Sequence, residues 1–121
     1  MIPISIVLVD SNIVFRNKLA SILEAASFKL LAQINHTEVE KQFEESVPDL
    51  AILCYKSSKP ATLKQARFIN DNFPNVKLII YSMFPTTLPE EIKVDRVLSQ
   101  TMDDLSTLDR IILELFQQNK Q

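Results

Sequence analysis

The chain has 121 residues and a mass of 13.8 kDa, so we expect one domain that covers residues 1–121. It contains no glycine, which excludes the glycine-dependent phosphate-binding loops. A single cysteine and a single histidine exclude a disulfide framework and a Cys/His zinc cluster. The net charge of −2 gives no basic field that would attract nucleic acid to this domain.

No apolar run reaches the roughly 18 residues that a membrane-spanning helix requires. The first residues, MIPISIVLVD, are too few and lack the basic flank of a signal peptide. We therefore expect a soluble, cytoplasmic protein that contacts neither membrane nor nucleic acid through this domain.

Five short apolar segments recur along the chain, and each is typical of a strand buried on both faces. Helical patterns fill the intervals, so the order predicts an α/β fold, a doubly wound, five-stranded parallel sheet built from five strand–helix units. The predicted strands are Ile4–Val9, Leu30–Ile34, Leu50–Cys54, Val76–Tyr81 and Val94–Leu98.

Capping residues mark the helix starts, because side chains such as Ser, Thr and Asn accept hydrogen bonds from the first free backbone N–H groups. The third predicted helix runs toward Asn72 and stops before Pro74. The predicted starts are Ser11 or Asn12, the T-x-x-E box of Thr37 and Glu40, Ser58 with Pro60, and the T-x-x-E box of Thr87 and Glu90.

The last predicted helix has an unusually wide apolar face. Its apolar side chains cover roughly 200°, whereas a helix packed on a sheet needs little more than ~100°. The surplus residues are Ile111, Leu113 and Phe116, which we assign to a dimer or partner face. The alternative is a deeply packed helix with one exposed leucine, which is common.

Chemistry in open parallel sheets gathers at the carboxyl ends of the strands. No pair of nucleophile and base can be assembled there, so we predict no catalytic residue and no enzyme activity. The strand ends carry Asp10 and Ser11, then Cys54, then Ser82, then Ser99 and Gln100.

Four stretches of the sequence resemble the receiver domain of two-component response regulators. They are IVLVDSN, PDLAILCY, NFPNVKLIIYSMF and VDRVLSQTMDDLSTL, of which PDLxxL and FPNVKxIxxS are the most specific parts. The resemblance covers almost the whole chain. It implies the flavodoxin-like (βα)5 receiver fold, and a DNA-binding output domain that would lie beyond Gln121.

The resemblance also implies a phosphotransfer site, which this sequence does not retain. The family uses an acidic pair for Mg²⁺, an aspartate that accepts the phosphoryl group, a Ser or Thr, and a Lys. A lone carboxylate is a poor magnesium site and a cysteine cannot form an acyl phosphate, so we expect no metal, no cofactor and no ordinary phosphotransfer. Asp10 and Ser82 match the pattern, and the substitutions are Ser11 for the second acid, Cys54 for the phospho-acceptor, Gln100 for the lysine and Val97 for the switch aromatic.

Several of these residues also have simpler interpretations. Cys54 can be explained as a small apolar residue buried at a strand end. His36 can be explained as a loop residue beside a helix cap. Asp49 stands at the start of the third strand, far from the pocket. For Asp10 and Ser82, a purely structural role, in which they only hydrogen-bond to the backbone, is as open as a functional role.

The sequence therefore favours an atypical receiver domain that acts as a phosphorylation-independent regulatory and dimerisation module. Its expected partners are a second copy of the chain or another signalling protein. Two alternatives remain open. One is a stand-alone monomeric adaptor that docks through Met83, Phe84 and Leu88, and the other is a ligand-sensing receiver that uses Asp10, Ser11 and Ser82.

Overall fold

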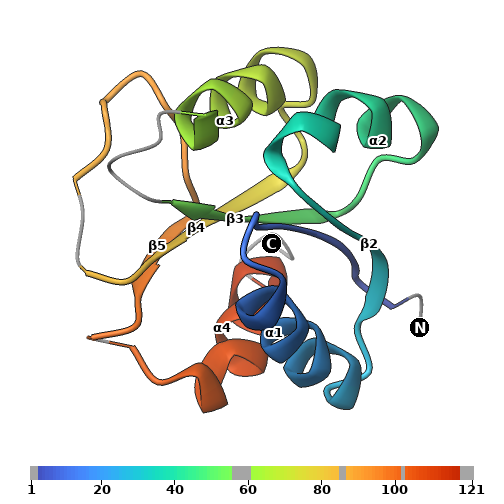
Figure 1. Ribbon diagram of the computed structural model, residues 1–121, viewed down its shortest axis with the longest axis vertical. Coiled ribbons are helices and arrows are strands. Elements are labelled where there is room, and N and C mark those ends of the chain that lie inside the picture. The colour runs from blue at the N-terminus through green and yellow to red at the C-terminus, as the bar shows by residue number, and fades with distance from the viewer. Residues whose placement is uncertain (1–2, 56–60, 85–86, 102, 118–121) are drawn as a thin grey trace.

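The computed structural model describes residues 3–55, 61–84, 87–101 and 103–117. The strands are β1 (Ser5–Val9), β2 (Lys29–Ile34), β3 (Leu50–Tyr55), β4 (Lys77–Ser82) and β5 (Arg96–Ser99), and the helices are α1 (Ile13–Ala25), α2 (Val39–Glu45), α3 (Ala61–Asn72) and α4 (Leu108–Gln117). The strands form one parallel sheet in the order β2-β1-β3-β4-β5. Helices α1 and α4 cover one face of the sheet, and α2 and α3 cover the other (Figure 1). The predicted doubly wound α/β fold is confirmed.

The strands are almost continuously apolar in sequence because both faces of the sheet are buried, so successive side chains on either face need to be apolar. Along β1, Ile6 and Leu8 pack toward α1 and α4, and Val7 and Val9 pack toward α2 and α3. All four side chains are completely buried. We call the two resulting clusters the α1/α4 core layer and the α2/α3 core layer.

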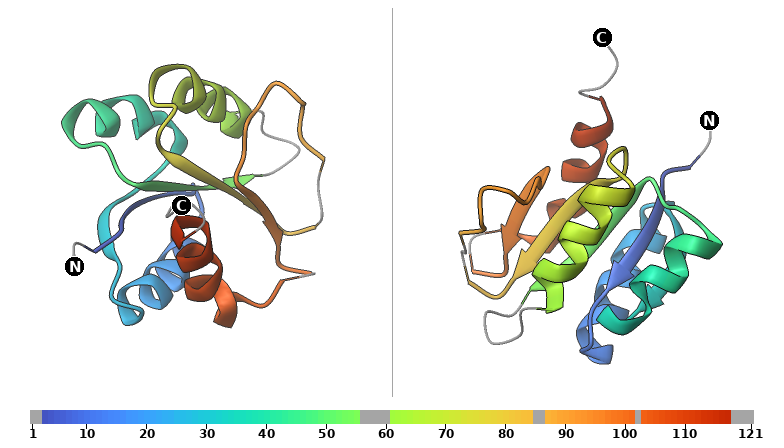
Figure 2. Two further views of the ribbon diagram at one scale, coloured as in Figure 1. Left: turned by 180° about the vertical axis from the view of Figure 1, so that it is seen from behind. Right: turned by 90° about the horizontal axis from the view of Figure 1, so that it is seen from above.

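Two aspartates hold the edge of the sheet at which the strands begin. The Asp49 carboxylate accepts a hydrogen bond from the Ser5 N–H at 2.9 Å, which ties the start of β3 to the start of β1. The Asp95 carboxylate, just before β5, accepts from the Leu78 N–H at 2.8 Å. The predicted position of Asp49, far from the carboxyl edge, is confirmed. Figure 2 shows that α4 also ends at this edge.

The connection between β4 and β5 differs from the sequence prediction. The Thr87/Glu90 box predicts a helix, but residues 87–95 form no helix. The Asn70 side chain of α3 instead donates to the Lys93 carbonyl at 3.0 Å and accepts from the Lys93 N–H at 2.8 Å. Because this amide occupies both hydrogen-bonding groups of Lys93, the segment is fixed to α3 as an irregular connection that contains a turn, in which the Ile92 N–H donates to the Pro89 carbonyl at 3.1 Å.

Further contacts hold the same segment against the α2/α3 core layer. Arg67 of α3 forms a salt bridge with Glu91 at 2.7 Å, and this hydrogen bond lowers the pKa of Glu91. Figures 1 and 2 show the segment running beside α3. Its apolar side chains that pack into the core layer are Leu88, Ile92 and Val94. The stabilisation from burying these side chains exceeds what a capped helix would gain locally at Thr87 and Glu90.

The remaining helix starts partly follow the predictions. Asn12 caps α1, as predicted, because its side chain accepts from the Phe15 N–H at 3.2 Å. The box predicted at Thr37 and Glu40 is wrong by two residues. The true capping box is Asn35 with Glu38, and it opens a single 3-10 turn at His36–Glu38 that leads into α2. Helix α3 ends at Asn72, before Pro74, as predicted, and its predicted start at Ser58 and Pro60 lies outside the described residues. Another 3-10 turn, Leu105–Thr107, precedes α4.

Helix α1 ends in a left-handed residue, a position that usually requires glycine. Ser27 has φ 68°, and its N–H donates to the Glu24 carbonyl at 3.0 Å. The next N–H, from Phe28, donates to the Leu23 carbonyl at 3.2 Å. This pair of bonds is the Schellman motif. Because the chain has no glycine, a serine adopts the strained conformation.

We expect Ser27→Gly to raise the free energy of unfolding by about 1 kcal/mol, because glycine adopts positive φ without a Cβ clash. The matched control is Ser21→Gly within α1, which should lower stability because glycine weakens a helix interior. Urea unfolding of the three proteins measures both changes. A loss of stability in Ser27→Gly would contradict the strain argument.

Candidate functional site

The carboxyl edge of the sheet, where the strands end, brings together most of the residues singled out in the sequence. Asp10 follows β1, Cys54 is the residue before the last of β3, and Ser82 is the last residue of β4. All three are buried. The Gln100 N–H donates to the Ser82 carbonyl at 2.9 Å, so its backbone lies at the same edge while its side chain is exposed. Ser11 is exposed, in contrast to these three buried residues.

Asp10 and Ser82 both bond to backbone. The Asp10 carboxylate accepts from the Asn12 N–H at 3.0 Å, which orients the start of α1. The Asp10 carbonyl accepts from the guanidinium of Arg16 at 3.1 Å. The Ser82 hydroxyl donates to the Phe84 carbonyl. These bonds give both residues a structural role at their strand ends.

The donor set at this edge does not fit a magnesium ion. Mg²⁺ takes hard oxygen ligands, usually one or two carboxylates together with substrate oxygens. Asp10 supplies the only carboxylate among the matched positions, and one of its oxygens is engaged by a backbone N–H. At the acceptor position Cys54 offers sulfur, a soft ligand. No three His, Cys, Asp or Glu side chains of the described ranges gather closely enough to hold a metal ion.

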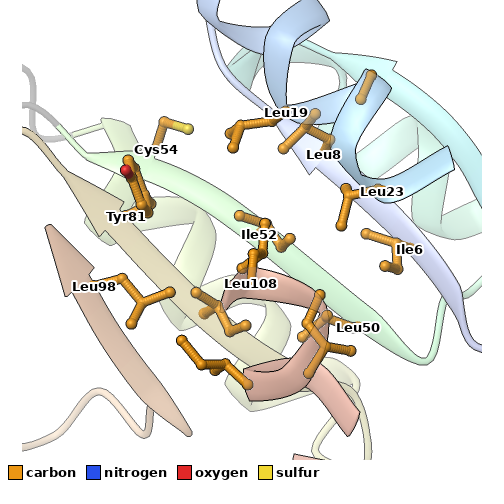
Figure 3. Close-up of a cluster of buried hydrophobic side chains, with 14 of the residues drawn as sticks. Ile6, Leu8, Leu19, Leu23, Leu50, Ile52, Cys54, Tyr81, Leu98 and Leu108 are labelled. Atoms are coloured by element: carbon orange, nitrogen blue, oxygen red, sulfur yellow. The ribbon is translucent and has the colours of Figure 1, made fainter. Parts of the chain in front are cut away.

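Cys54 and Tyr81 form a buried pair at the carboxyl edge. They face each other across β3 and β4, and only 7% of Cys54 and 3% of Tyr81 is exposed. Figure 3 shows the two side chains together at one end of the α1/α4 core layer. The ring of Phe15, on α1, stacks on the Tyr81 ring with centroids 5.5 Å apart.

The Tyr81 hydroxyl is buried near Cys54 and Asp103. Burial, and after it the nearby Cys54 and Asp103 side chains, raise the pKa of Tyr81 to about 12. The hydroxyl oxygen makes no hydrogen bond within the part of the chain that the structure describes. An unpaired buried hydroxyl is costly, so the packing of the ring, not a hydrogen bond, fixes the position of Tyr81.

His36 belongs to a hydrogen-bonded group beside the end of β3. Thr62, at the start of α3, donates from its hydroxyl to the Cys54 carbonyl at 3.0 Å, and its Oγ1 lies 2.9 Å from His36 Nε2. His36 Nε2 is also 3.2 Å from the Cys54 carbonyl, which can only accept. Nε2 therefore carries the proton. His36 thus hydrogen-bonds the β2–α2 connection to the end of β3 and the start of α3. The sequence did not indicate this contact.

The predicted partner face on α4 is only partly exposed. Ile111 was assigned to that face, but only 9% of it is exposed and it belongs to the α1/α4 core layer, because α4 turns this side toward the sheet. Leu113 is 46% exposed on the outer side. Phe116 is half-buried, and the Lys77 ammonium lies 5.7 Å from the centre of its ring.

Other exposed apolar residues lie near the carboxyl edge or on the last strand. Met83 and Phe84, assigned to the adaptor alternative, are exposed, whereas Leu88 of the same set packs in the core. Val97, which the resemblance aligns with the switch aromatic, is exposed on β5, one of the two edge strands. Sequence reasoning overlooked Ile13 and Val14 at the start of α1, which are exposed as well.

Tyr81 is the main site residue that sequence reasoning missed. Its signal was present, because it is a polar-tipped aromatic inside the apolar run of β4, next to the matched Ser82. Arg16 was missed because its contact with Asp10 runs through a backbone carbonyl. Such contacts leave no pattern of residue types.

Similarity to solved structures places the fold among receiver domains. A CheY-like response regulator receiver domain from Methanospirillum hungatei JF-1 is 17% identical with a TM-score of 0.80, and the match covers 98% of each chain. A LuxR-family DNA-binding response regulator from Staphylococcus aureus is 20% identical with a TM-score of 0.78, covering 93% of this chain and 98% of that one. An atypical orphan response regulator with a phosphorylation-independent regulatory mechanism is 16% identical with a TM-score of 0.75, covering 93% and 95%.

The chain therefore has the flavodoxin-like fold of response regulator receiver domains, as the sequence resemblance implied. No family model and no curated protein sequence matches it. Within the described residues, no helix has the length and apolar character needed to cross a membrane.

We expect Tyr81→Phe to keep or raise the free energy of unfolding at neutral pH, by up to about 1 kcal/mol, because it removes a buried hydroxyl that lacks a partner. Above the ordinary tyrosine pKa of 10.0 the unfolded chain releases the Tyr81 proton, whereas the folded chain holds it up to about 12. Ionisation thus favours the unfolded state, and the wild type loses stability across this interval.

Urea unfolding of both proteins at a series of pH values from neutral to 12 measures the difference. The advantage of Tyr81→Phe should widen above pH 10.0 and stay constant below it. Parallel losses in the two proteins across the alkaline interval would show that the Tyr81 pKa is not raised.

Proposed function

We propose that this chain is an atypical receiver domain that works as a regulatory and dimerisation module, independent of phosphorylation at residue 54. The observation that carries the proposal is that Cys54, at the acceptor position of a receiver fold, is a buried thiol paired with Tyr81. The loss of the second acid and the lysine, at Ser11 and Gln100, supports it. So does the similarity to an orphan regulator whose mechanism is phosphorylation-independent.

The partner in this proposal is a second copy of the chain. Leu113 is an exposed leucine on the outer side of α4, and its neighbours Arg110 and Glu114 are exposed charges of opposite sign. In a two-fold dimer the same patch meets itself, so Arg110 of one copy can meet Glu114 of the other while the leucines pack together. By similarity to the Staphylococcus aureus regulator, we propose that the module serves a DNA-binding output domain.

A monomeric adaptor is the second candidate function. The exposure of Met83 and Phe84, two large apolar side chains at the carboxyl edge, favours it. Such side chains contribute strongly to protein interfaces. This reading predicts a monomer at every concentration, whereas the dimer proposal predicts a mass that rises with concentration.

Sedimentation over a concentration series, with and without Mg²⁺ and beryllofluoride, tests the proposal. We expect a dimer that is indifferent to both additives. Leu113→Glu should weaken self-association on the order of tenfold or more, because it places like charges across the two-fold contact. Val47→Glu is the matched control, since Val47 has a similar exposure of 48% against 46% and lies beyond α2.

Three results would overturn parts of the proposal. Dimerisation driven by the additives would show that the pocket still switches. A monomer under every condition would favour the adaptor. Equal dissociation constants for Leu113→Glu and Val47→Glu would remove α4 from the dimer face.

Cys54→Asp alone should not restore phosphorylation, because Ser11 still supplies no second carboxylate and Gln100 no cation. It should also lower stability, since it places a carboxylate at a buried position near Asp10. Intact-mass measurement after incubation with acetyl phosphate and Mg²⁺ gives the readout. Cys54→Asn is the uncharged control, and an ordinary receiver domain is labelled in parallel. Labelling of Cys54→Asp at the rate of that receiver would refute the expectation.

A further inference from the structure

We propose that Tyr81 is a steric plug that closes the pocket over residue 54, and that it prevents occupation of the pocket even where the missing acids and lysine are restored. This inference rests on the proposed function and adds to it a determinant that lies outside the phosphotransfer motif.

The pairing of β3 with β4 places the plug. Tyr81 is the direct partner of Cys54 across the two strands, and both side chains belong to the α1/α4 core layer. Cross-strand partners on one face of a sheet lie within contact distance. A group added to the side chain of residue 54 must therefore occupy space beside the Tyr81 ring, and Figure 3 shows the two side chains at the same end of the cluster.

Phe15, on α1, packs against the Tyr81 ring. Its ring stacks on the Tyr81 ring with centroids 5.5 Å apart and an interplanar angle of 30°. Only 3% of Tyr81 and 7% of Cys54 reaches solvent. The two aromatic rings, one from β4 and one from α1, thus fill the end of the core where a receiver must admit a phosphodonor.

Asp103, in the connection between β5 and α4, lies on another side of Tyr81. The Tyr81 hydroxyl lies near enough to Asp103 of that loop, and to Cys54, for both to raise its pKa. Asp103 is fixed to the end of β5, because its carboxylate accepts from the Ser99 N–H at 2.9 Å and its N–H donates to the Ser99 carbonyl at 2.9 Å. The Tyr81 side chain is therefore bordered by Cys54 on β3, by Phe15 on α1 and by Asp103.

The ring, and not the hydroxyl, forms the barrier. The hydroxyl has no hydrogen-bond partner in the described ranges, so no polar contact holds Tyr81 in place. Transfer to residue 54 needs room for the donor and for the transferred group. Tyr81→Phe should leave the plug intact, whereas Tyr81→Val should open it.

The first experiment uses the native chain, in which Cys54 is the single cysteine. The rate at which Cys54 reacts with a chromogenic aromatic disulfide reports access to the pocket. Phe43→Val is the matched control, because Phe43 is an aromatic residue of the α2/α3 core layer with 1% exposure. Its loss destabilises the fold without opening the carboxyl edge.

We expect Tyr81→Val to react on the order of tenfold faster than Phe43→Val, compared at equal free energy of unfolding, because it opens the site locally. Tyr81→Phe should react at the wild-type rate. If Tyr81→Val does not fold, Tyr81→Leu replaces it as a milder truncation. Equal rates in the Tyr81 and Phe43 variants would show that only global unfolding exposes the thiol, and would overturn the plug.

The second experiment restores the family pattern with Ser11→Asp, Cys54→Asp and Gln100→Lys together. Fluorine NMR of Mg²⁺ with beryllofluoride detects occupation of the pocket. We expect no bound signal while Tyr81 is present, and a bound signal once Tyr81→Val is added to the three substitutions. Binding in the presence of Tyr81, or no binding by the folded four-fold variant, would overturn the inference.

The two proposals fail in different ways. A bound signal or a change in assembly in the wild type would contradict phosphorylation independence itself. If the wild type shows neither a bound fluorine signal nor a change in assembly, and the triple variant that keeps Tyr81 does bind beryllofluoride, the proposed function stands and only the plug is rejected.

Discussion

The register between β3 and its two neighbours is the constraint on which the candidate site depends. Strand β3 is hydrogen-bonded on both sides and buried on both faces, so its side chains must alternate between the two core layers. A slip of one residue would move Cys54 out of the α1/α4 core layer and place the charged Asp49 in the strand. The bond from Ser5 to the Asp49 carboxylate resists that slip at the opposite edge. The pairing of Cys54 with Tyr81 follows from this register.

Much of the fold could be predicted from the sequence, because each strand is a local apolar run that no other element resembles. The capping signals were less reliable. A T-x-x-E box describes only what a helix would gain locally, and at Thr87 that gain was smaller than the burial of Ile92 and the double hydrogen bond between Asn70 and Lys93. Those partners lie 23 residues apart, so no local pattern could reveal them.

The candidate site, like the fold, has features that the sequence predicts and features that it does not. The meeting of Asp10, Cys54 and Ser82 was predictable, because parallel strands end at one edge. The roles of Tyr81 and Ile111 were not. Tyr81 depends on a register between strands and on a ring from α1, and Ile111 depends on how α4 is rotated against the sheet. Helical spacing orders the residues around the helix axis, but packing decides which side faces inward.

The exchange of a charged pocket for an apolar pair changes what can regulate such a domain. Clustered carboxylates repel one another and respond to a metal or a phosphoryl group, whereas a thiol beside a phenol extends the core to the edge of the sheet. A ligand shifts a conformational equilibrium only by its difference in affinity for the two states. In the function proposed above, the burial of Cys54 and Tyr81 against each other leaves a phosphoryl group no such difference to act on. The proposed association with a second copy would supply one, since a partner that binds one state stabilises it more as its concentration rises. The proposed function therefore makes the concentration of the chain and of its partners, and not a phosphodonor, the quantity that regulates it.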